Sequence, residues 1–241
     1  MKSIRRIAMA TILATALATT TGAACADDFG DVKKLSQDAF LRLSKDLASV
    51  TALRALSPGV ALNFFGVDVG LELGVTKVEN GAEWQQAGGG STSVVTPRVS
   101  IHKGLGGGFD IGASIGTAGG SGLSTIGGIV RYQAIEPTTL LPGLGFRLTG
   151  NREYGSSSVQ VRSLGLDAIV AKPLLVITPY IGLGTVRTDT KAPNTTLSDT
   201  SVSRSRVFVG FDSKLAFATV SAEAEKSGGA TTISGKIGFR F

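Results

Sequence analysis

The end of the chain carries the pattern that most constrains its fold. Counting back from the C-terminus, every second residue is apolar or small: Phe241, Phe239, Ile237, Gly235 and Ile233. The residues between them are mostly polar: Arg240, Gly238, Lys236, Ser234 and Thr232. Alternation with a period of two is typical of a β-strand with one apolar and one polar face. The chain is therefore expected to end on an amphipathic strand.

The same alternation recurs along most of the chain. It predicts ten strands, at about 65–76, 95–102, 109–116, 124–134, 144–149, 163–170, 175–187, 203–212, 215–225 and 232–241. A soluble secreted β-sandwich also alternates, but it usually has larger apolar residues and shorter loops. Here the apolar face is only modestly hydrophobic, and the other face holds Gly, Ser, Thr and charges of both signs. We therefore expect an all-β fold, a transmembrane antiparallel up-and-down β-barrel of about ten strands preceded by an amphipathic N-terminal helix.

The connections predict how such a barrel sits in a cell outer membrane. If the first strand runs outward, the external loops are 79–93, 117–123, 152–158, 188–202 and 226–231. The periplasmic turns are then 103–107, 135–143, 171–174 and 212–214, so the longest connections lie outside, as is usual for these barrels. Aromatic residues gather at the periplasmic strand ends: Phe65, Phe109, Tyr132, Phe146, Phe211, Phe217, Phe239 and Phe241. The expected partner of the barrel's outer face is outer-membrane lipid.

The N-terminus has the features of an export signal. Basic residues near Lys2 precede an apolar run from residue 7 to about 18, and small residues at Ala24-Cys25-Ala26 favour cleavage after Ala26. Acylation of Cys25 is the alternative, but Gly22 stands where lipoprotein signals usually carry a large aliphatic residue. Removing residues 1–26 removes the only cysteine and three basic residues, so the net charge falls from +6 to +3. No basic cluster with interleaved aromatics remains, which argues against nucleic-acid binding.

Residues 30–54 have a different period. Apolar residues recur at three- and four-residue steps, which predicts an amphipathic helix. The expected organisation is a signal peptide at 1–26, a periplasmic amphipathic helix and linker at 27–60, and the barrel at 61–241. The helix could fill the lumen, cover the periplasmic mouth or lie on the inner leaflet, and we expect it to cover the periplasmic mouth.

The polar face of the strands predicts a charged lumen. The charges expected to face inward are Asp68, Glu72, Arg98, Asp110, Arg131, Arg147, Asp167, Arg206, Asp212, Glu223, Glu225, Lys236 and Arg240. Pairing of neighbouring strands about their turns would bring Arg98 and Arg131 near Asp110, Arg206 near Glu223, and Lys236 near Glu223 or Glu225. Closure of the last strand on the first would bring Arg240 near Asp68. Paired charges would brace a filled polar core. The alternative is a narrow conduit, in which inward glycines leave space for water, a small solute or the helix.

Catalytic chemistry has little support in the sequence. The one histidine, His102, is expected at the periplasmic end of the second strand, where a polar residue at the membrane interface is the simpler interpretation. With one histidine and no cysteine in the mature chain, a His/Cys metal site is not expected. The glycine runs at 104–108 and 182–184 lack the Lys-Ser/Thr pair of a phosphate-binding loop. We expect no enzyme activity, no cofactor and no metal.

Two resemblances add to this. The final strand, with Phe239 and Phe241, resembles the C-terminal signal by which barrel precursors are recognised, which implies the barrel-assembly machinery as a partner. The second resemblance is carried by five segments: Phe65–Glu72, Pro97-Arg98, His102–Leu105, Thr178–Gly182 and Gly235–Phe241. With these segments the chain from Phe64 onward resembles a little-characterised family of small proteobacterial outer-membrane β-barrel proteins of unknown function.

These observations order the functions to expect. The first is a barrel with a polar, largely filled lumen that serves envelope structure or surface contact through its Ser/Thr-rich loops. The second is a narrow channel or a carrier for a small or amphiphilic solute. The third is an outer-membrane lipid-modifying enzyme, which would need a serine or carboxylate converging on His102.

Overall fold

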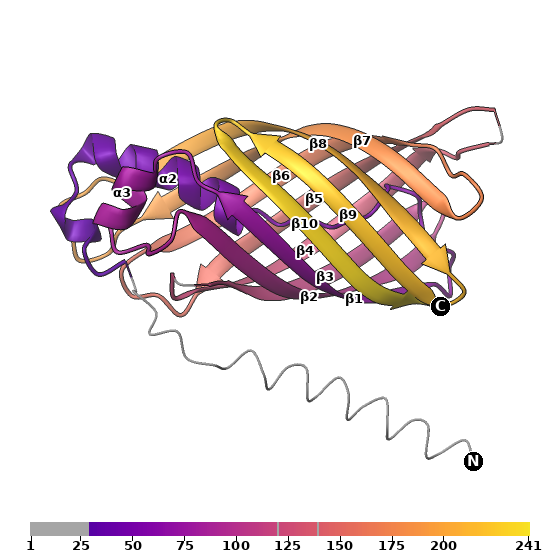
Figure 1. Cartoon of the computed structure of the whole chain (residues 1–241), viewed down its shortest axis with the longest axis horizontal. Coiled ribbons are helices and arrows are strands. Elements are labelled where there is room, and N and C mark those ends of the chain that lie inside the picture. The colour runs from indigo at the N-terminus through magenta and orange to yellow at the C-terminus, as the bar shows by residue number, and fades with distance from the viewer. Residues whose placement is uncertain (1–28, 120, 139) are drawn as a thin grey trace, which may run out of the picture.

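Ten antiparallel strands close into a barrel in the computed structural model, which describes residues 29–241 apart from 120 and 139 (Figure 1). The strands are β1 (Val67–Lys77), β2 (Ser93–Gly106), β3 (Phe109–Ala118), β4 (Leu123–Ile135), β5 (Gly143–Tyr154), β6 (Gln160–Ala171), β7 (Ile177–Lys191), β8 (Thr200–Leu215), β9 (Ala218–Ser227) and β10 (Ala230–Arg240). Each strand pairs with its neighbours in the sequence, and β1 closes the barrel against β10 with Asp68 opposite Arg240. The predicted fold class and the approximate positions of the strands are confirmed, but the turn predicted at 212–214 lies at 216–217, because β8 continues to Leu215. The predicted signal peptide, with Cys25, lies outside the described residues.

The two ends of the barrel differ. At the terminus end, where β1 begins and β10 ends, the connections are residues 107–108, 136–142, 172–176 and 216–217. At the opposite end, called the loop end below, they are 78–92, 119–122, 155–159, 192–199 and 228–229. Short turns face the periplasm in outer-membrane barrels and longer loops face outward. We therefore orient the loop end outward.

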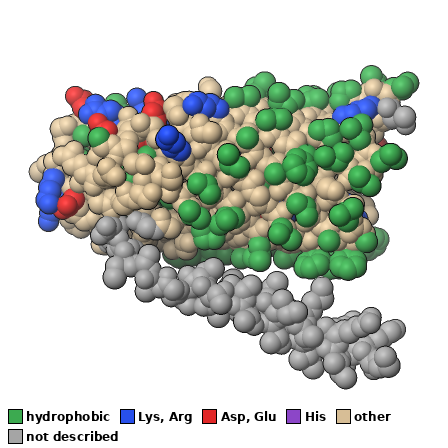
Figure 2. Space-filling model, viewed as in Figure 1, with side chains coloured by type: hydrophobic (Ala, Val, Ile, Leu, Met, Phe, Trp, Pro, Cys, Tyr) green, Lys and Arg blue, Asp and Glu red, His purple; other side chains and the backbone are tan. Residues whose placement is uncertain are grey.

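The outer wall is apolar where a membrane would touch it. Alternate residues of the strands expose large hydrophobic side chains, as Leu71, Leu73 and Val75 do on β1. Figure 2 shows hydrophobic side chains spread along the barrel wall, whereas charged side chains gather mainly over the loop end. Near the terminus end, exposed aromatics stack in pairs, Phe109 on Tyr132 and Phe217 on Phe239. A closed barrel with an apolar wall and an aromatic girdle is a transmembrane barrel of the outer membrane.

The segment before β1 occupies the inside of this barrel. After a short 3₁₀ helix, η2 (Val32–Lys34), helix α2 (Gln37–Thr51) is capped at its N-terminus by Ser36, whose hydroxyl accepts a hydrogen bond from Ala39 N at 3.3 Å. Helix α2 lies at the loop end beside α3 (Gly81–Gln86), a short helix in the β1–β2 connection (Figure 1). Residues 52–64, called the threaded segment below, then run without helix or strand structure toward the terminus end, where β1 starts. No helix among the described residues is long and apolar enough to cross a membrane.

The predicted helix is confirmed, but its predicted position is wrong. We expected it to cover the mouth at the terminus end, and it lies inside the opposite end. The reason is the apolar face of α2, because Phe40, Leu43, Leu47 and Val50 are fully buried. They join one hydrophobic cluster with residues of the loop end: Phe29, Val32, Leu35, Ala39, Val78, Trp84, Ala87, Val94, Ala118, Leu123, Val159, Val161 and Ala192. Burying such a face stabilises the helix where the barrel offers apolar partners.

The lumen and the threaded segment as the candidate functional site

The strands place all the predicted inward charges inside the barrel. Side chains alternate across a strand, so the polar set of each strand faces the lumen once the apolar set faces lipid. All thirteen are buried except Arg240, whose side chain is 16% exposed beside the terminus end. The lumen therefore brings together charges of both signs from nine of the ten strands, and the remaining strand, β7, contributes Tyr180.

At the terminus end, four of these residues form a chain of ion pairs. Asp68 pairs with Lys236, and its Oδ2 also accepts a hydrogen bond from Arg240 Nε at 2.7 Å. Arg240 donates through both Nη atoms to Asp212, at 2.8 and 3.1 Å. The predicted pair of Arg240 with Asp68 is thus present, whereas Lys236 lies on Asp68 rather than on Glu223 or Glu225.

Further along the lumen, Asp167 is the centre of a second cluster. It accepts from Arg147 Nε at 2.7 Å and from Arg206 Nε and Nη2, both at 2.6 Å. Arg147 also stacks over the Phe208 ring, with 4.9 Å from its Cζ to the ring centroid. The predicted pairing of Arg206 with Glu223 is wrong, because Arg206 of β8 reaches past β7 to Asp167 of β6. Glu223 instead accepts from the Tyr180 hydroxyl at 3.0 Å.

A third contact joins the barrel to the N-terminal segment. Arg54 donates to Glu225 Oε1 from Nη2 at 2.9 Å and from Nε at 3.2 Å, and both side chains are buried. The same guanidinium donates to the carbonyl of Ser49 and to the hydroxyl of Thr232. Arg54 therefore fastens the end of α2 to the inner faces of β9 and β10.

Other lumen side chains bind the main chain of the N-terminal segment. Arg98, expected near Asp110, instead donates to the carbonyls of Val50 and Thr51, both at 3.4 Å. The Thr51 carbonyl also accepts from Asn151 Nδ2 at 3.0 Å, and Arg147 donates to the Ala55 carbonyl. These contacts recognise peptide groups rather than side chains.

The contacts continue to the terminus end. Arg131 donates to the Ser57 hydroxyl and pairs with Asp110 at 3.1 Å, as predicted. Asp110 in turn accepts from the Leu62 amide at 3.0 Å. The partners of residues 57 and 62 lie on β3 and β4, whereas those of residues 50–55 lie on β2, β5, β9 and β10. The threaded segment therefore runs along the inside of the wall (Figure 1).

Glycine makes room for this segment. A Cβ added at Gly145, on the inner face of β5, would lie 2.6 Å from the Gly59 carbonyl oxygen. The sequence predicts free space at the inward glycines, but at two of them a long neighbour fills it, since a Cβ at Gly70 would meet Lys236 and one at Gly116 would meet Arg98. The space expected for water or solute is thus taken, at these two positions, by lumen side chains.

The signal that could have placed the threaded segment is a set of apolar residues on the polar face. Ile129 faces inward and packs with Leu53 and Ala55. Ile169 and Phe208 also face inward, in a cluster that Val60 covers. Apolar side chains would be out of place in a water-filled lumen, so they indicate an internal partner.

At the loop end, polar contacts tie α2 to the β1–β2 connection. The carboxylate of Asp46 accepts from the amides of Glu79 and Asn80 at 2.8 and 2.9 Å. Glu79 pairs with Arg204 of β8, and this hydrogen bond holds the pKa of Glu79 below its usual range. The hydrogen bond from Arg42 likewise lowers the pKa of Glu83. The loop end is therefore a packed cap rather than a set of separate loops.

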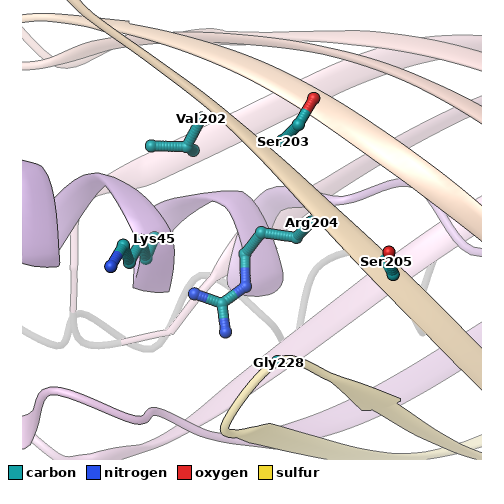
Figure 3. Close-up of a pocket in the computed structure, with 6 residues that line it drawn as sticks. All are labelled: Lys45, Val202, Ser203, Arg204, Ser205 and Gly228. Atoms are coloured by element: carbon teal, nitrogen blue, oxygen red, sulfur yellow. The ribbon is translucent and has the colours of Figure 1, made fainter.

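A pocket opens in the wall beside this cap. It has a volume of about 530 Å³ and is lined by Lys45, Val202, Ser203, Arg204, Ser205 and Gly228 (Figure 3). It forms because β8 continues past the last β8–β9 pair, Arg206 with Ser227. Figure 3 shows Lys45 of α2 and Arg204 of β8 extending into the gap. The two cations would suit a small anionic group, although Arg204 already pairs with Glu79.

His102 lies at the terminus end of β2, as predicted, but it is not at the membrane interface. Its side chain is buried in the lumen, beside Gly112 of β3 and in register with Asp68 of β1. Neither ring nitrogen has a hydrogen-bond partner among the described residues, so no serine or carboxylate there is placed to activate it. Within residues 29–241, as far as they are described, no three His, Cys, Asp or Glu side chains are grouped as a metal site would require.

Comparison with known proteins finds likeness of fold. No family model and no curated protein matches the chain. Among solved structures, the KdgM porin is 10% identical, with 72% of this chain and 99% of that chain covered and a TM-score of 0.38. Neisserial surface protein A is 13% identical over 74% and 96%, with a TM-score of 0.32. The translocator domain of the autotransporter NalP from Neisseria meningitidis is 12% identical over 86% and 99%, with a TM-score of 0.47.

Proposed function

We propose that this outer-membrane barrel is closed by its own residues 37–64 and acts at its outer surface, in envelope integrity or in surface contact. The observation that carries the proposal is the set of hydrogen bonds from Arg98, Asn151 and Arg147 to main-chain carbonyls of residues 50–55. A segment bound along the lumen in this way leaves little room for solute. Membership of the small proteobacterial barrel family is part of the proposal and rests on the motifs quoted above.

The order of the loop end supports a surface role. Gln37 of α2 donates to the Ser198 carbonyl at 3.1 Å and accepts from the Ser198 amide at 2.9 Å, which fixes the β7–β8 loop against the helix. This loop is rich in Ser and Thr and carries exposed polar side chains such as Thr196. A fixed polar surface above the membrane is suited to contact with other envelope or surface components.

The test is single-channel conductance of the refolded mature protein in planar bilayers. A closed barrel should be silent. Leu43→Asp should produce open events, because a carboxylate in the fully buried cluster of α2 would expel the helix from the loop end. Leu41→Asp is the matched control, since Leu41 lies on the same helix but is 38% exposed. It should stay as silent as the unsubstituted protein.

Two other outcomes would revise the proposal. Steady conductance in the unsubstituted protein would refute the closed barrel and support a narrow channel or carrier, with the inward charges as its lining. The observation that favours a channel or carrier is the presence of buried charges of both signs along the lumen. Silence in both variants, with folding verified by heat-modifiable migration, would show that α2 is not what closes the barrel.

The proposal is of a non-enzymatic protein. The lipid-modifying alternative would need His102 to reach lipid at the outer leaflet, and its side chain is enclosed at the other end of the lumen. Hydrolysis of outer-membrane phospholipid or lipid A by the refolded protein, lost in His102→Ala, would overturn the non-enzymatic assignment.

A further inference from the structure

The direction of the N-terminal segment has a consequence for topology. Phe29, the first described residue, packs edge-on against Trp84 of α3 at the loop end, with 5.1 Å between ring centroids. The chain then passes from α2 through the threaded segment to β1, which starts at the terminus end. The chain therefore spans the membrane level once inside the barrel, before its ten strands span the same level as the barrel wall.

We infer that the lumen is a conduit for polypeptide, through which the protein's own N-terminal residues reach the cell surface. This inference rests on the closed lumen proposed above and on the outward orientation of the loop end. If cleavage follows Ala26, two residues precede Phe29, and they span at most about 7 Å. The hydrocarbon core is about 30 Å thick. The mature N-terminus then cannot return to the periplasm and must lie outside.

The chemistry of the lumen fits an extended peptide as its ligand. Arg98, Asn151 and Arg147 donate to carbonyls, and Asp110 accepts from an amide, so both kinds of peptide group are recognised. The side chains of the threaded segment are mostly small or apolar, among them Ala52, Ala55, Ser57 and Gly59. Recognition through peptide groups does not depend on sequence, which is what passage of successive residues through one site requires.

The residues that emerge are held at the loop end and remain accessible there. Leu35 and Val32 are buried against the cap, whereas Lys33, Lys34 and Asp38 are exposed. Lys33 therefore offers a position at which exposure on the cell surface can be measured without disturbing the buried cluster.

The experiment labels single cysteines on intact cells that express the full chain. The reagent is a polyethylene-glycol maleimide too large for general porins. The test site is Lys33→Cys, with Thr196→Cys in the β7–β8 loop and Leu175→Cys in the β6–β7 turn as references for the two ends, all three exposed. The unsubstituted chain, whose one cysteine precedes the predicted cleavage site, gives the background.

We expect Lys33→Cys and Thr196→Cys to be labelled to the same extent on intact cells. Leu175→Cys should react only after the outer membrane is permeabilised. Labelling of Lys33→Cys only after permeabilisation, with Thr196→Cys labelled on intact cells, would place the N-terminal residues in the periplasm and overturn the inference. Labelling of Leu175→Cys on intact cells, with Thr196→Cys protected, would reverse the barrel and also overturn it.

The result is separable from that of the conductance test. A barrel that conducts ions but labels at Lys33→Cys would refute the closed lumen and leave the outward N-terminus standing. A silent barrel with Lys33→Cys protected on intact cells would leave the closed lumen standing and refute the outward N-terminus. Heat-modifiable migration of each cysteine variant confirms that the labelled protein is folded.

Discussion

Removing the guanidinium of Arg54 should release α2 while leaving the barrel intact. The guanidinium makes two hydrogen bonds to Glu225 and others to Ser49 O, Ala52 O and Thr232 Oγ1. In Arg54→Met, Arg206 at 3.7 Å would be the one ion-pair partner that Glu225 keeps among the described residues, and Glu225 would remain buried. None of these contacts belongs to the backbone pairing that joins the ten strands, so the loss should fall on the N-terminal segment.

The magnitude follows from the burial of both partners. Breaking a buried ion pair by removing one member costs about 3–5 kcal/mol. At about 1.4 kcal/mol for each tenfold change, the open population of α2 should rise roughly a hundred-fold to a few thousand-fold. Replacing both charges by apolar groups is often close to neutral. The double variant Arg54→Met with Glu225→Leu should therefore recover most of the lost stability.

Hydrogen exchange of the refolded protein measures this change directly. Amides of α2 should exchange faster in Arg54→Met by the factor given above, while those of β1 to β10 keep their protection. Unchanged exchange of α2 in Arg54→Met would refute the claim that this ion pair holds the segment. A double variant that loses as much protection as the two single variants together would refute the argument from the unpaired charge.

Three further predictions follow from other contacts. Gly145→Val should crowd the Gly59 carbonyl and raise α2 exchange, whereas Gly150→Val, where an added Cβ meets only Leu164 at 3.9 Å, should not. Glu79 has a lowered pKa, so the stability that it gives the cap is present above its ordinary pKa and is lost as pH falls through the lowered value. Fluorescence of the single tryptophan should show this acid transition, and Glu79→Gln should abolish it; the same transition in both proteins would contradict the assignment. Phe241→Ala should slow assembly in cells but barely change the thermal stability of the refolded barrel, because the Phe241 side chain is 64% exposed; equal losses in both assays would argue against an assembly signal.

Most of the barrel could be predicted from the sequence because one face of each strand meets lipid and the other does not. Even β4, whose alternation is weak around Gly127 and Gly128, keeps Ile126 and Val130 outward and Arg131 inward. Pairs across one turn could also be predicted from the register, such as Arg131 with Asp110. Pairs between strands that are not neighbours, such as Arg206 with Asp167, depend on side-chain length and on barrel curvature, which the strand pattern does not contain.

The position of the helix could not be predicted for a different reason. The lumen contacts of the N-terminal segment at Val50, Thr51 and Ala55 are made by carbonyl groups, which every residue has, so the sequence bears no mark of these contacts. Amphipathicity predicts that α2 buries one face, but not against what. The inward apolar residues Ile129 and Phe208 indicate an apolar partner inside the lumen, but they can be recognised as inward only once the strands have been assigned to a barrel.

The threaded segment is part of the same chain as β1, so the lumen binds a tethered ligand whose occupancy does not depend on the protein concentration. Only residues 65 and 66 separate the segment from Val67, so its concentration at the lumen is set by the length of the chain and not by the amount of protein. For short linkers this effective concentration is on the order of millimolar or higher. Any free peptide or solute that competes for Arg98 and Arg147 must exceed it, and occupancy of the lumen should be the same for one molecule in a membrane as for many.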